Sequence, residues 1–340
     1  MPRARKVTVA LFAFAATLVS SPLTAAPKEA PSIPRILVFT KTTGFRHASI
    51  PVATRTVREL AGQGGLSVVT TEDPTAFSDA NLRRYAAVVF LLTTGDVLND
   101  SQQLAFQRYI RRGGGYVGVH SAADTEYGWA WYGGLVGAYF RSHPQIQRAV
   151  IDVTDALHPS TAGLPRRWSR MDEWYNFARN PRPSVRVLAR IDESTYSPGP
   201  GAMGVDHPIV WSHRYQGGRA WYTAGGHTEE SYAEPLFRRH LLEGIRYAAG
   251  LSPPRILSVS STIRGGRLVV RLRYTSCLPC KGRLQIRLGK RTARASLALG
   301  RGSGRATSSS LPRGRWRFSV TLEDPRTGLE HSVSRWARVR

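Results

Sequence analysis

The sequence predicts an α/β protein built on a doubly wound parallel sheet, followed by a small all-β domain. Two observations predict the first part. Short continuous apolar runs, such as 36–39 and 86–92, are typical of strands buried on both faces, and helical stretches separate them. One observation predicts the second part. Beyond residue 254 the apolar runs alternate, are interrupted by glycine, proline and serine, and have no convincing helix between them.

The elements expected in the first part follow one another in βα order. Strands are expected at 36–39, 66–70, 86–92, 116–119, 146–153, 185–191, 209–213 and 220–223, and helices at 50–60, 100–112 and 230–249. In such sheets ligands bind beyond the carboxyl ends of the strands. The loops at 40–49 and 120–126 are therefore the places where we expect functional side chains.

Proline-rich segments divide the chain. Pro27 to Pro34 leads into the first domain, expected over 34–250, and Ser252-Pro253-Pro254 is a linker to the second, expected over 255–340. The second domain is predicted to be a basic accessory sandwich of immunoglobulin-like type. Its expected strands are 256–259, 268–274, 282–288, 293–299 and 315–322.

Residues 1–26 are typical of an export signal. Basic residues precede an apolar run from Val7 to Val19, and small residues follow it up to Ala25 and Ala26. The run is shorter than the roughly 20 residues of a membrane span, and no later segment approaches that length. We therefore expect a mature protein without a transmembrane span, secreted or located in the periplasm or cell envelope.

The composition is that of a globular protein of 340 residues, 41% hydrophobic and 21% charged, which excludes a disordered or fibrous chain. The formal charge of +25 is unevenly placed. Residues 34–250 hold 24 basic and 19 acidic residues, whereas residues 251–340 hold 20 and 3. Since arginine outnumbers lysine 43 to 5, compositional bias accounts for part of this excess. The remainder predicts attraction of the second domain to an anionic cell-envelope surface, and the absence of a nucleic-acid motif argues against nucleic acid.

The cysteines and glycines exclude several classes of chemistry. Cys277 and Cys280 are the only thiols, are expected to form a local disulfide, and leave the first 276 residues without a cysteine nucleophile. The glycines at 113–115 precede a predicted strand instead of following one, and no Walker sequence is present. We therefore expect no nucleotide cofactor.

The segment Gly118-Val119-His120-Ser121-Ala122 is typical of a sharp elbow at the end of a strand. Small residues flank the central position where backbone and helix crowd together, and the elbow lifts the central side chain above the sheet. The lifted residue is His120. Adjacent residues at a strand end point in different directions, so a direct pair between His120 and Ser121 is not expected.

Five ordered motifs resemble those of the ThuA family, named for trehalose utilisation. They are Thr43-Gly44-Phe45-Arg46-His47, Gly114 to Ala122, Asp172-Glu173-Trp174-Tyr175, His207-Pro208-Ile209-Val210-Trp211 and Tyr222 to His227. The resemblance implies the flavodoxin-like fold of class I glutamine amidotransferases, and an association with trehalose or its 3-keto derivatives. In those amidotransferases the elbow holds a cysteine nucleophile. His120 stands there in this chain, which excludes cysteine-dependent amidotransferase chemistry.

The motifs also supply candidate site residues. His120, His47, Glu173 and His227 are the catalytic candidates, because imidazoles and a carboxylate move protons on a sugar. Equally, His47, His120 and His227 could hold a divalent metal, zinc or manganese, that polarises a ketone. The candidates for contact with a carbohydrate substrate are Arg46, Ser121, Asp124, Tyr175 and His207.

We therefore expect proton transfer or isomerisation on an oxidised sugar, and two alternatives stay open. The first is a non-catalytic sugar-binding or scaffold protein that keeps the same cleft. The second is a glycoside hydrolase, which requires Glu173 and Asp124 to face the cleft together. His143, His158 and His207 each precede proline and are interpreted mainly as turn or strand-entry residues.

Overall fold

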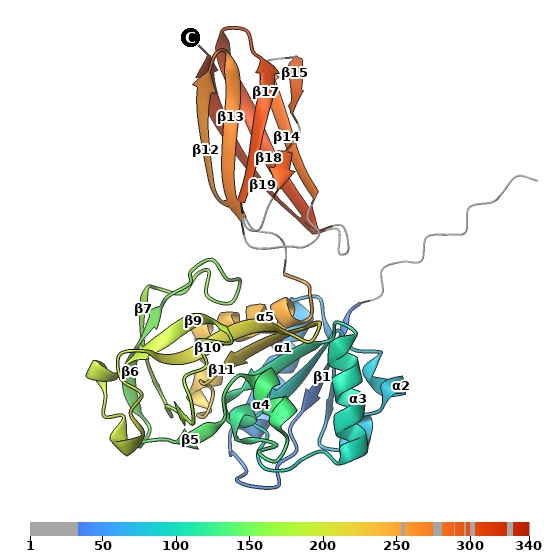
Figure 1. Ribbon diagram of the computed structural model, residues 1–340, viewed down its shortest axis with the longest axis vertical. Coiled ribbons are helices and arrows are strands. Elements are labelled where there is room, and N and C mark those ends of the chain that lie inside the picture. The colour runs from blue at the N-terminus through green and yellow to red at the C-terminus, as the bar shows by residue number, and fades with distance from the viewer. Residues whose placement is uncertain are drawn as a thin grey trace, which may run out of the picture. The chain divides into compact units, whose positions relative to one another are not determined.

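The computed structural model describes residues 33–252, 256–274, 281–288, 290–295, 297–299, 303–324 and 329–339. Up to residue 248 these residues form a large sheet with helices, and from residue 256 onward they form two smaller sheets (Figure 1). The expected signal peptide at 1–26 and the expected disulfide between Cys277 and Cys280 lie outside the described residues.

The strands of the first region are β1 (Arg35–Phe39), β2 (Ser67–Thr71), β3 (Ala87–Leu91), β4 (Gly115–Val119), β5 (Phe140–Ser142), β6 (Gln147–Val153), β7 (Arg167–Asp172), β8 (Asn176–Phe177), β9 (Arg186–Asp192), β10 (His207–Tyr215) and β11 (Gly218–Thr223). Its α-helices are α1 (Ile50–Gln63), α2 (Asp79–Leu82), α3 (Asp100–Arg111), α4 (Ala130–Val136) and α5 (Pro235–Ala248). Short 3-10 helices include η2 (His120–Asp124) and η5 (Glu230–Tyr232). The expected strands β1 to β4 are present to within one residue at each end.

The large sheet has the order β2-β1-β3-β4-β11-β10-β9-β6-β7. Its first five strands pair in parallel, which confirms the predicted α/β class. From β11 to β7 the neighbouring strands are antiparallel, so the sheet is mixed. A tight turn accounts for the pair β10 and β11. Gln216 and Gly217 have φ of 46° and 103°, which makes a two-residue hairpin and forces the chain to return antiparallel.

Helices cover both faces of the sheet (Figure 1). Neighbouring side chains on a strand point to opposite faces. On β11, Trp221 packs against His240 of α5, with ring centroids 5.0 Å apart. On the other face, Tyr116 of β4 shares a hydroxyl contact of 2.8 Å with Tyr132 of α4. No described helix has the length and hydropathy needed to cross a bilayer.

The C-terminal strands form two antiparallel sheets of four strands, β12-β13-β17-β16 and β15-β14-β18-β19. The strands are β12 (Ile256–Arg264), β13 (Arg267–Tyr274), β14 (Lys281–Leu288), β15 (Arg291–Ala295), β16 (Leu297–Leu299), β17 (Ser303–Ser310), β18 (Gly314–Asp324) and β19 (Leu329–Val339). Inward-facing residues of both sheets, such as Leu272 and Phe318, bury one hydrophobic core. That core shares no residue with the core of the first region. The all-β prediction is confirmed, and the immunoglobulin-like assignment stays a prediction.

Five strands were not expected. Two of them, β5 and β8, are short, and the three longer ones, β7, β17 and β19, lack a clear apolar signal. In β7 the buried positions alternate as predicted for a strand, but two of them are Arg170 and Asp172. In β17 the inward positions include Gly304 and Ser308, and β19 has few large apolar residues. Sequence patterns detect strands through apolar side chains, so strands that bury polar or very small residues escape them.

Candidate functional site

The elbow after β4 has the geometry that the sequence predicts. His120 has φ of 51°, in the left-handed region that a residue with a side chain rarely adopts. A Cβ on Gly118 would lie 3.2 Å from the Cβ of Ala122 and 2.9 Å from the ring of Tyr222, so a larger residue would not fit there. The small residues of the motif therefore permit the turn that directs the imidazole of His120 toward the carboxyl end of the sheet.

Hydrogen bonding fixes the ring of His120. Its Nδ1 lies 2.7 Å from the carbonyl oxygen of Ala224. A carbonyl oxygen only accepts, so Nδ1 carries the hydrogen, and in the neutral ring Nε2 presents a lone pair. Nε2 lies 3.2 Å from Oε2 of Glu173 and 3.1 Å from Nδ1 of His227. A histidine held by a backbone carbonyl in this way is typical of metal ligands.

Glu173 and His227 are held in place by the buried carboxylate of Asp172. Its Oδ1 accepts hydrogen bonds from the backbone N–H groups of Glu173 at 3.0 Å and His227 at 3.1 Å. Its Oδ2 accepts the N–H of Gly226 at 2.8 Å and forms an ion pair of 2.8 Å with Arg170. One fully buried carboxylate therefore sets the positions of two candidate site residues that are far apart in the sequence.

His47 enters the site from the loop after β1. Its side chain is buried, and its Nδ1 has no hydrogen-bond partner in the described part of the chain. Burial, together with the nearby His120 and His227, lowers the pKa of His47 to about 3. The ring is therefore neutral at pH 7, the form that binds a metal. The hydroxyl of Ser49 donates a hydrogen bond of 2.6 Å to the carbonyl of His227, which joins the two loops.

The four side chains of His47, His120, Glu173 and His227 form one cluster. Each offers a ligand atom, and these atoms lie within 4.8 Å of one another. Burial alone would raise the pKa of Glu173, but its contacts with His120 and His227 lower that pKa well below its ordinary value. An anionic oxygen and two imidazole nitrogens thus meet at one point. Their lone pairs repel unless a proton or a cation lies between them.

The spacing inside the cluster suits a metal ion. Oε2 of Glu173, Nε2 of His120 and Nδ1 of His227 are 3.1 to 3.2 Å apart. A tetrahedral ion with bonds of about 2.0 to 2.1 Å has ligands separated by about 3.3 Å. With His47 as a fourth donor, three nitrogens and one carboxylate oxygen are available, a set that zinc or manganese accepts.

Sequence reasoning missed His143, which lies next to the cluster. Its Nδ1 is 3.1 Å from Oε1 of Glu173, the oxygen that the other histidines do not contact, and 44% of its side chain is exposed. The histidine thus connects the buried carboxylate to solvent. The following proline led us to interpret it as a turn residue, and the single sequence offers no signal that separates the two roles.

Aromatic rings surround the cluster. Tyr175 packs on His120 with ring centroids 4.1 Å apart, and Phe45 contacts His47 with centroids 4.9 Å apart. Phe45 is 66% exposed, and Tyr127 is 49% exposed and donates a hydrogen bond of 2.7 Å to Asp124. Burial raises the pKa of Asp124. Exposed rings beside polar groups are a surface on which a sugar ring can stack.

Three expected contact residues take other positions. Arg46 is half-exposed and pairs with Glu72 at 2.7 Å. Ser121 is fully buried, and its hydroxyl has no partner within the described residues. His207 is fully buried, with Nε2 2.8 Å from the carbonyl of Tyr175 and Nδ1 2.8 Å from Glu193. His207 therefore lies outside the cluster. Its contact with the carbonyl of Tyr175 supports the backbone of that residue.

One family model matches most of the chain, and two solved structures resemble its fold. Residues 35–248 match the family model ThuA, described as trehalose utilisation. A ThuA-like protein structure from Bacteroides uniformis has a TM-score of 0.54 and 23% identity, and the match covers 66% of this chain and 95% of that one. A ThuA-like protein from Parabacteroides merdae has a TM-score of 0.54 and 21% identity, with 64% and 90% covered. These two structures support the fold, and no curated protein matches the chain.

Proposed function

The chain belongs to the ThuA family, and from that premise we propose that it is an enzyme acting on a carbohydrate related to trehalose or a 3-keto-sugar. The observation that carries the proposal is the cluster of His47, His120, Glu173 and His227 at the carboxyl end of the parallel strands. In α/β sheets this is the edge where substrates bind. We assign to these four residues the binding of a divalent cation, zinc or manganese.

The proposed reaction is a proton transfer that moves the carbonyl of an oxidised sugar by one carbon. A cation in the cluster would polarise the ketone oxygen and stabilise the negative charge that forms when the neighbouring carbon loses its proton. His143 is suited to carry that proton, because it is half-exposed and contacts Glu173. Phe45 and Tyr127 offer their exposed rings to the sugar.

A two-carboxylate hydrolase fits this geometry less well. Both oxygens of Glu173 are engaged, Oε2 by His120 and His227 and Oε1 by His143. A glycosidase needs a carboxylate that is free to attack or to protonate the glycosidic bond. The stronger alternative is a sugar-binding or scaffold protein that uses the same ring-lined surface without turnover.

Metal content and turnover test the proposal together. Elemental analysis of the purified protein should give about one zinc or manganese per chain, and a variant with His120→Asn and His227→Ala should contain almost none. His213→Gln is the matched control, because His213 lies on β10, outside the cluster, and its Nε2 donates to the carbonyl of Leu135. This control should keep its metal.

Turnover separates the alternatives. Isomerisation of 3-keto-trehalose or 3-keto-glucose by the metal-loaded protein supports the proposed enzymatic function. Saturable sugar binding without formation of a product supports the alternative of a sugar-binding or scaffold protein. Full turnover by metal-free protein would show that the reaction does not need the cation, and would leave acid–base catalysis by the histidines as the mechanism.

We further propose that the enzyme acts outside the cytoplasm, on the strength of the signal-like residues 1–26. Fractionation of cells producing the full chain should recover a shortened protein, cleaved near Ala25, in the envelope or medium. A full-length protein in the cytoplasmic fraction would contradict this.

A further inference from the structure

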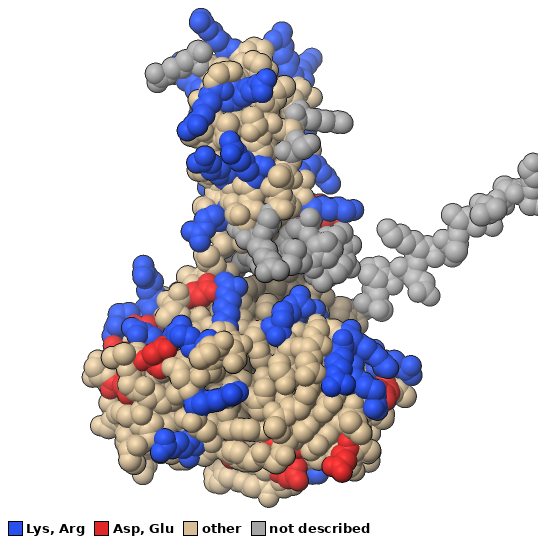
Figure 2. Space-filling view, viewed as in Figure 1, with Lys and Arg blue, Asp and Glu red and all other residues tan. Residues whose placement is uncertain are grey.

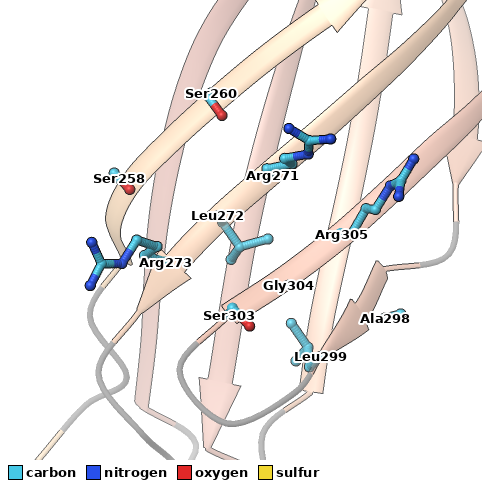
Figure 3. Close-up of a pocket in the computed structure, with 10 residues that line it drawn as sticks. All are labelled: Ser258, Ser260, Arg271, Leu272, Arg273, Ala298, Leu299, Ser303, Gly304 and Arg305. Carbon is cyan, nitrogen blue, oxygen red and sulfur yellow. The ribbon is translucent and has the colours of Figure 1, made fainter.

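A basic hollow opens on the sheet β12-β13-β17-β16 (Figure 3). It has a volume of about 630 Å³, within the range of small-molecule sites. Arg271 and Arg273 of β13 and Arg305 of β17 line it, and Figure 3 shows the side chains of Arg271 and Arg305 extending the same way from neighbouring strands. The other lining residues are Ser258, Ser260, Leu272, Ala298, Leu299, Ser303 and Gly304.

The strand register concentrates positive charge in this hollow. Arg271 lies directly opposite Arg305, and Arg273 follows Arg271 two residues along the same face. Like charges placed opposite each other on a sheet destabilise it. None of the three arginines forms an ion pair or hydrogen bond with another residue in the described parts of the chain. The charge is therefore free to meet an external anion.

No acidic residue occurs in the four strands of this sheet, and Arg264 and Arg267, paired at the far end of β12 and β13, continue its basic face. The three acidic residues beyond residue 250 all lie on β18 and β19 of the other sheet. Figure 2 shows lysines and arginines spread over the C-terminal strands with scarcely any acidic residue among them. This basic row is longer than the hollow, which suits a polymer with repeated negative charges better than a single ion.

The lining distinguishes between classes of polyanion. Serines on β12 and β17 offer hydroxyls to sugar hydroxyls. Leu272 is buried in the core of these strands and faces away from Arg271 and Arg273, so the arginines and serines supply the polar groups that can contact a polymer. No aromatic ring lines the hollow for a nucleic-acid base to stack on, and none of its lining residues is an exposed large apolar residue that could insert into a lipid layer.

We propose that Arg271, Arg273 and Arg305 form a binding site for an acidic polysaccharide. The guanidinium groups bind its oxyanions in paired hydrogen bonds, and the serines bind its hydroxyls. The site lies on different strands from the histidine cluster and does not depend on the proposed reaction. A protein that turns over no sugar would leave this proposal intact.

The test measures binding of the full chain to polygalacturonate at several salt concentrations, with neutral dextran as the uncharged polymer. Arg271→Gln, Arg273→Gln and Arg305→Gln together should weaken binding about tenfold or more, and the three Arg→Lys changes should weaken it about threefold at unchanged charge. The matched control is Arg283→Gln, Arg287→Gln and Arg317→Gln on the other sheet, where Arg287 also lies opposite Arg317. The control removes the same charge and should weaken binding less than about threefold.

Several outcomes would overturn the proposal. If the control variant loses as much affinity as the test variant, the binding is diffuse electrostatics without a site. If phosphatidylglycerol vesicles or a single-stranded oligonucleotide bind more tightly than polygalacturonate and depend on the same arginines, the ligand class is wrong. Melting temperatures of all variants no lower than that of the unsubstituted chain show that the exposed substitutions leave the fold intact.

Discussion

The two regions of this chain place their charged residues in opposite ways. The first region buries ionisable side chains at the end of its sheet, among them His47, His120, Arg170, Asp172 and Glu173. Among the described residues from 256 onward, the buried polar set contains Ser308 alone, and the arginines stand outside. Burying ionisable groups is costly unless they are paired, so it indicates a site with chemistry. Exposed, unpaired arginines instead indicate binding.

The largest expected effect follows from removing the most deeply embedded charge. Asp172→Ala removes the partner of Arg170 at 2.8 Å, so that Glu234 at 2.9 Å is the remaining carboxylate paired with this buried arginine, and it releases the N–H groups of Glu173, Gly226 and His227. We expect a loss of about 3 to 5 kcal/mol in the free energy of unfolding and loss of the bound metal. Urea unfolding and elemental analysis measure the two effects.

The matched change in the other region is Ser308→Ala. Its hydroxyl accepts the N–H of Leu268 at 2.9 Å, and its removal should cost about 1 kcal/mol. Equal losses from Asp172→Ala and Ser308→Ala would contradict the distinction between the two regions.

The next largest effect is expected from a substitution of His120, at the elbow after β4. His120→Asn keeps a residue that tolerates φ of 51° and removes the imidazole from the cluster. We expect turnover to fall by at least about a hundredfold, with only about 1 kcal/mol lost in stability from the hydrogen bond to Ala224. Steady-state kinetics and thermal unfolding measure both. If His120→Asn unfolds while the control variant His213→Gln stays folded, His120 is a packing residue and not a site residue.

Acid should destabilise the first region through its buried histidines. Burial lowers the pKa of His240 to about 4, where the neutral ring donates to the carbonyl of Ser160 and lies 3.3 Å from the hydroxyl of Thr223. The unfolded chain has the ordinary pKa of about 6.5 and binds the proton first as the pH falls. The stabilising contribution is therefore complete above pH 6.5 and is lost between 6.5 and 4, about 3 kcal/mol in all.

His240→Gln should reduce the pH dependence of the unfolding free energy in this window by up to one proton. Urea unfolding at a series of pH values measures the slope. An unchanged slope in the variant would show that His240 does not contribute.

The success of sequence reasoning differed along the chain for physical reasons. β1 and β3 are almost entirely continuous apolar runs, and the elbow depends on Gly118 and Ala122, so both could be predicted from local residues. β7 could not, because its buried positions hold Arg170 and Asp172, whose further partners, Glu234 and the N–H of Gly226, lie far along the chain. The antiparallel pairing of β10 with β11 follows from the turn at Gln216 and Gly217, whereas the other antiparallel pairs of the sheet are joined by longer connections.

The candidate site shows the same limit. His47, His120, Glu173 and His227 were named from their motifs, and the structure brings them together. His143 was interpreted as a turn residue, because nothing in the neighbouring residues shows that it contacts Glu173. The role of Asp172 was also invisible, since its partners come from the loop after β11. Contacts between distant segments need the fold before they can be seen.

The smallest expected effect on turnover comes from the largest deletion. The hydrophobic cores of the two regions share no residue, and all four cluster residues precede residue 250. A chain of residues 33–250 should therefore fold and keep its turnover within about twofold, since a domain of roughly 200 residues buries a full core.

The same chain should lose its retention on polygalacturonate, because Arg271, Arg273 and Arg305 are removed with the second region. Kinetics, circular dichroism and polymer binding of the full and shortened chains make the comparison. If the shortened chain stays folded and keeps its metal but loses turnover, the C-terminal strands contribute to catalysis, and the division between chemistry in one region and binding in the other fails.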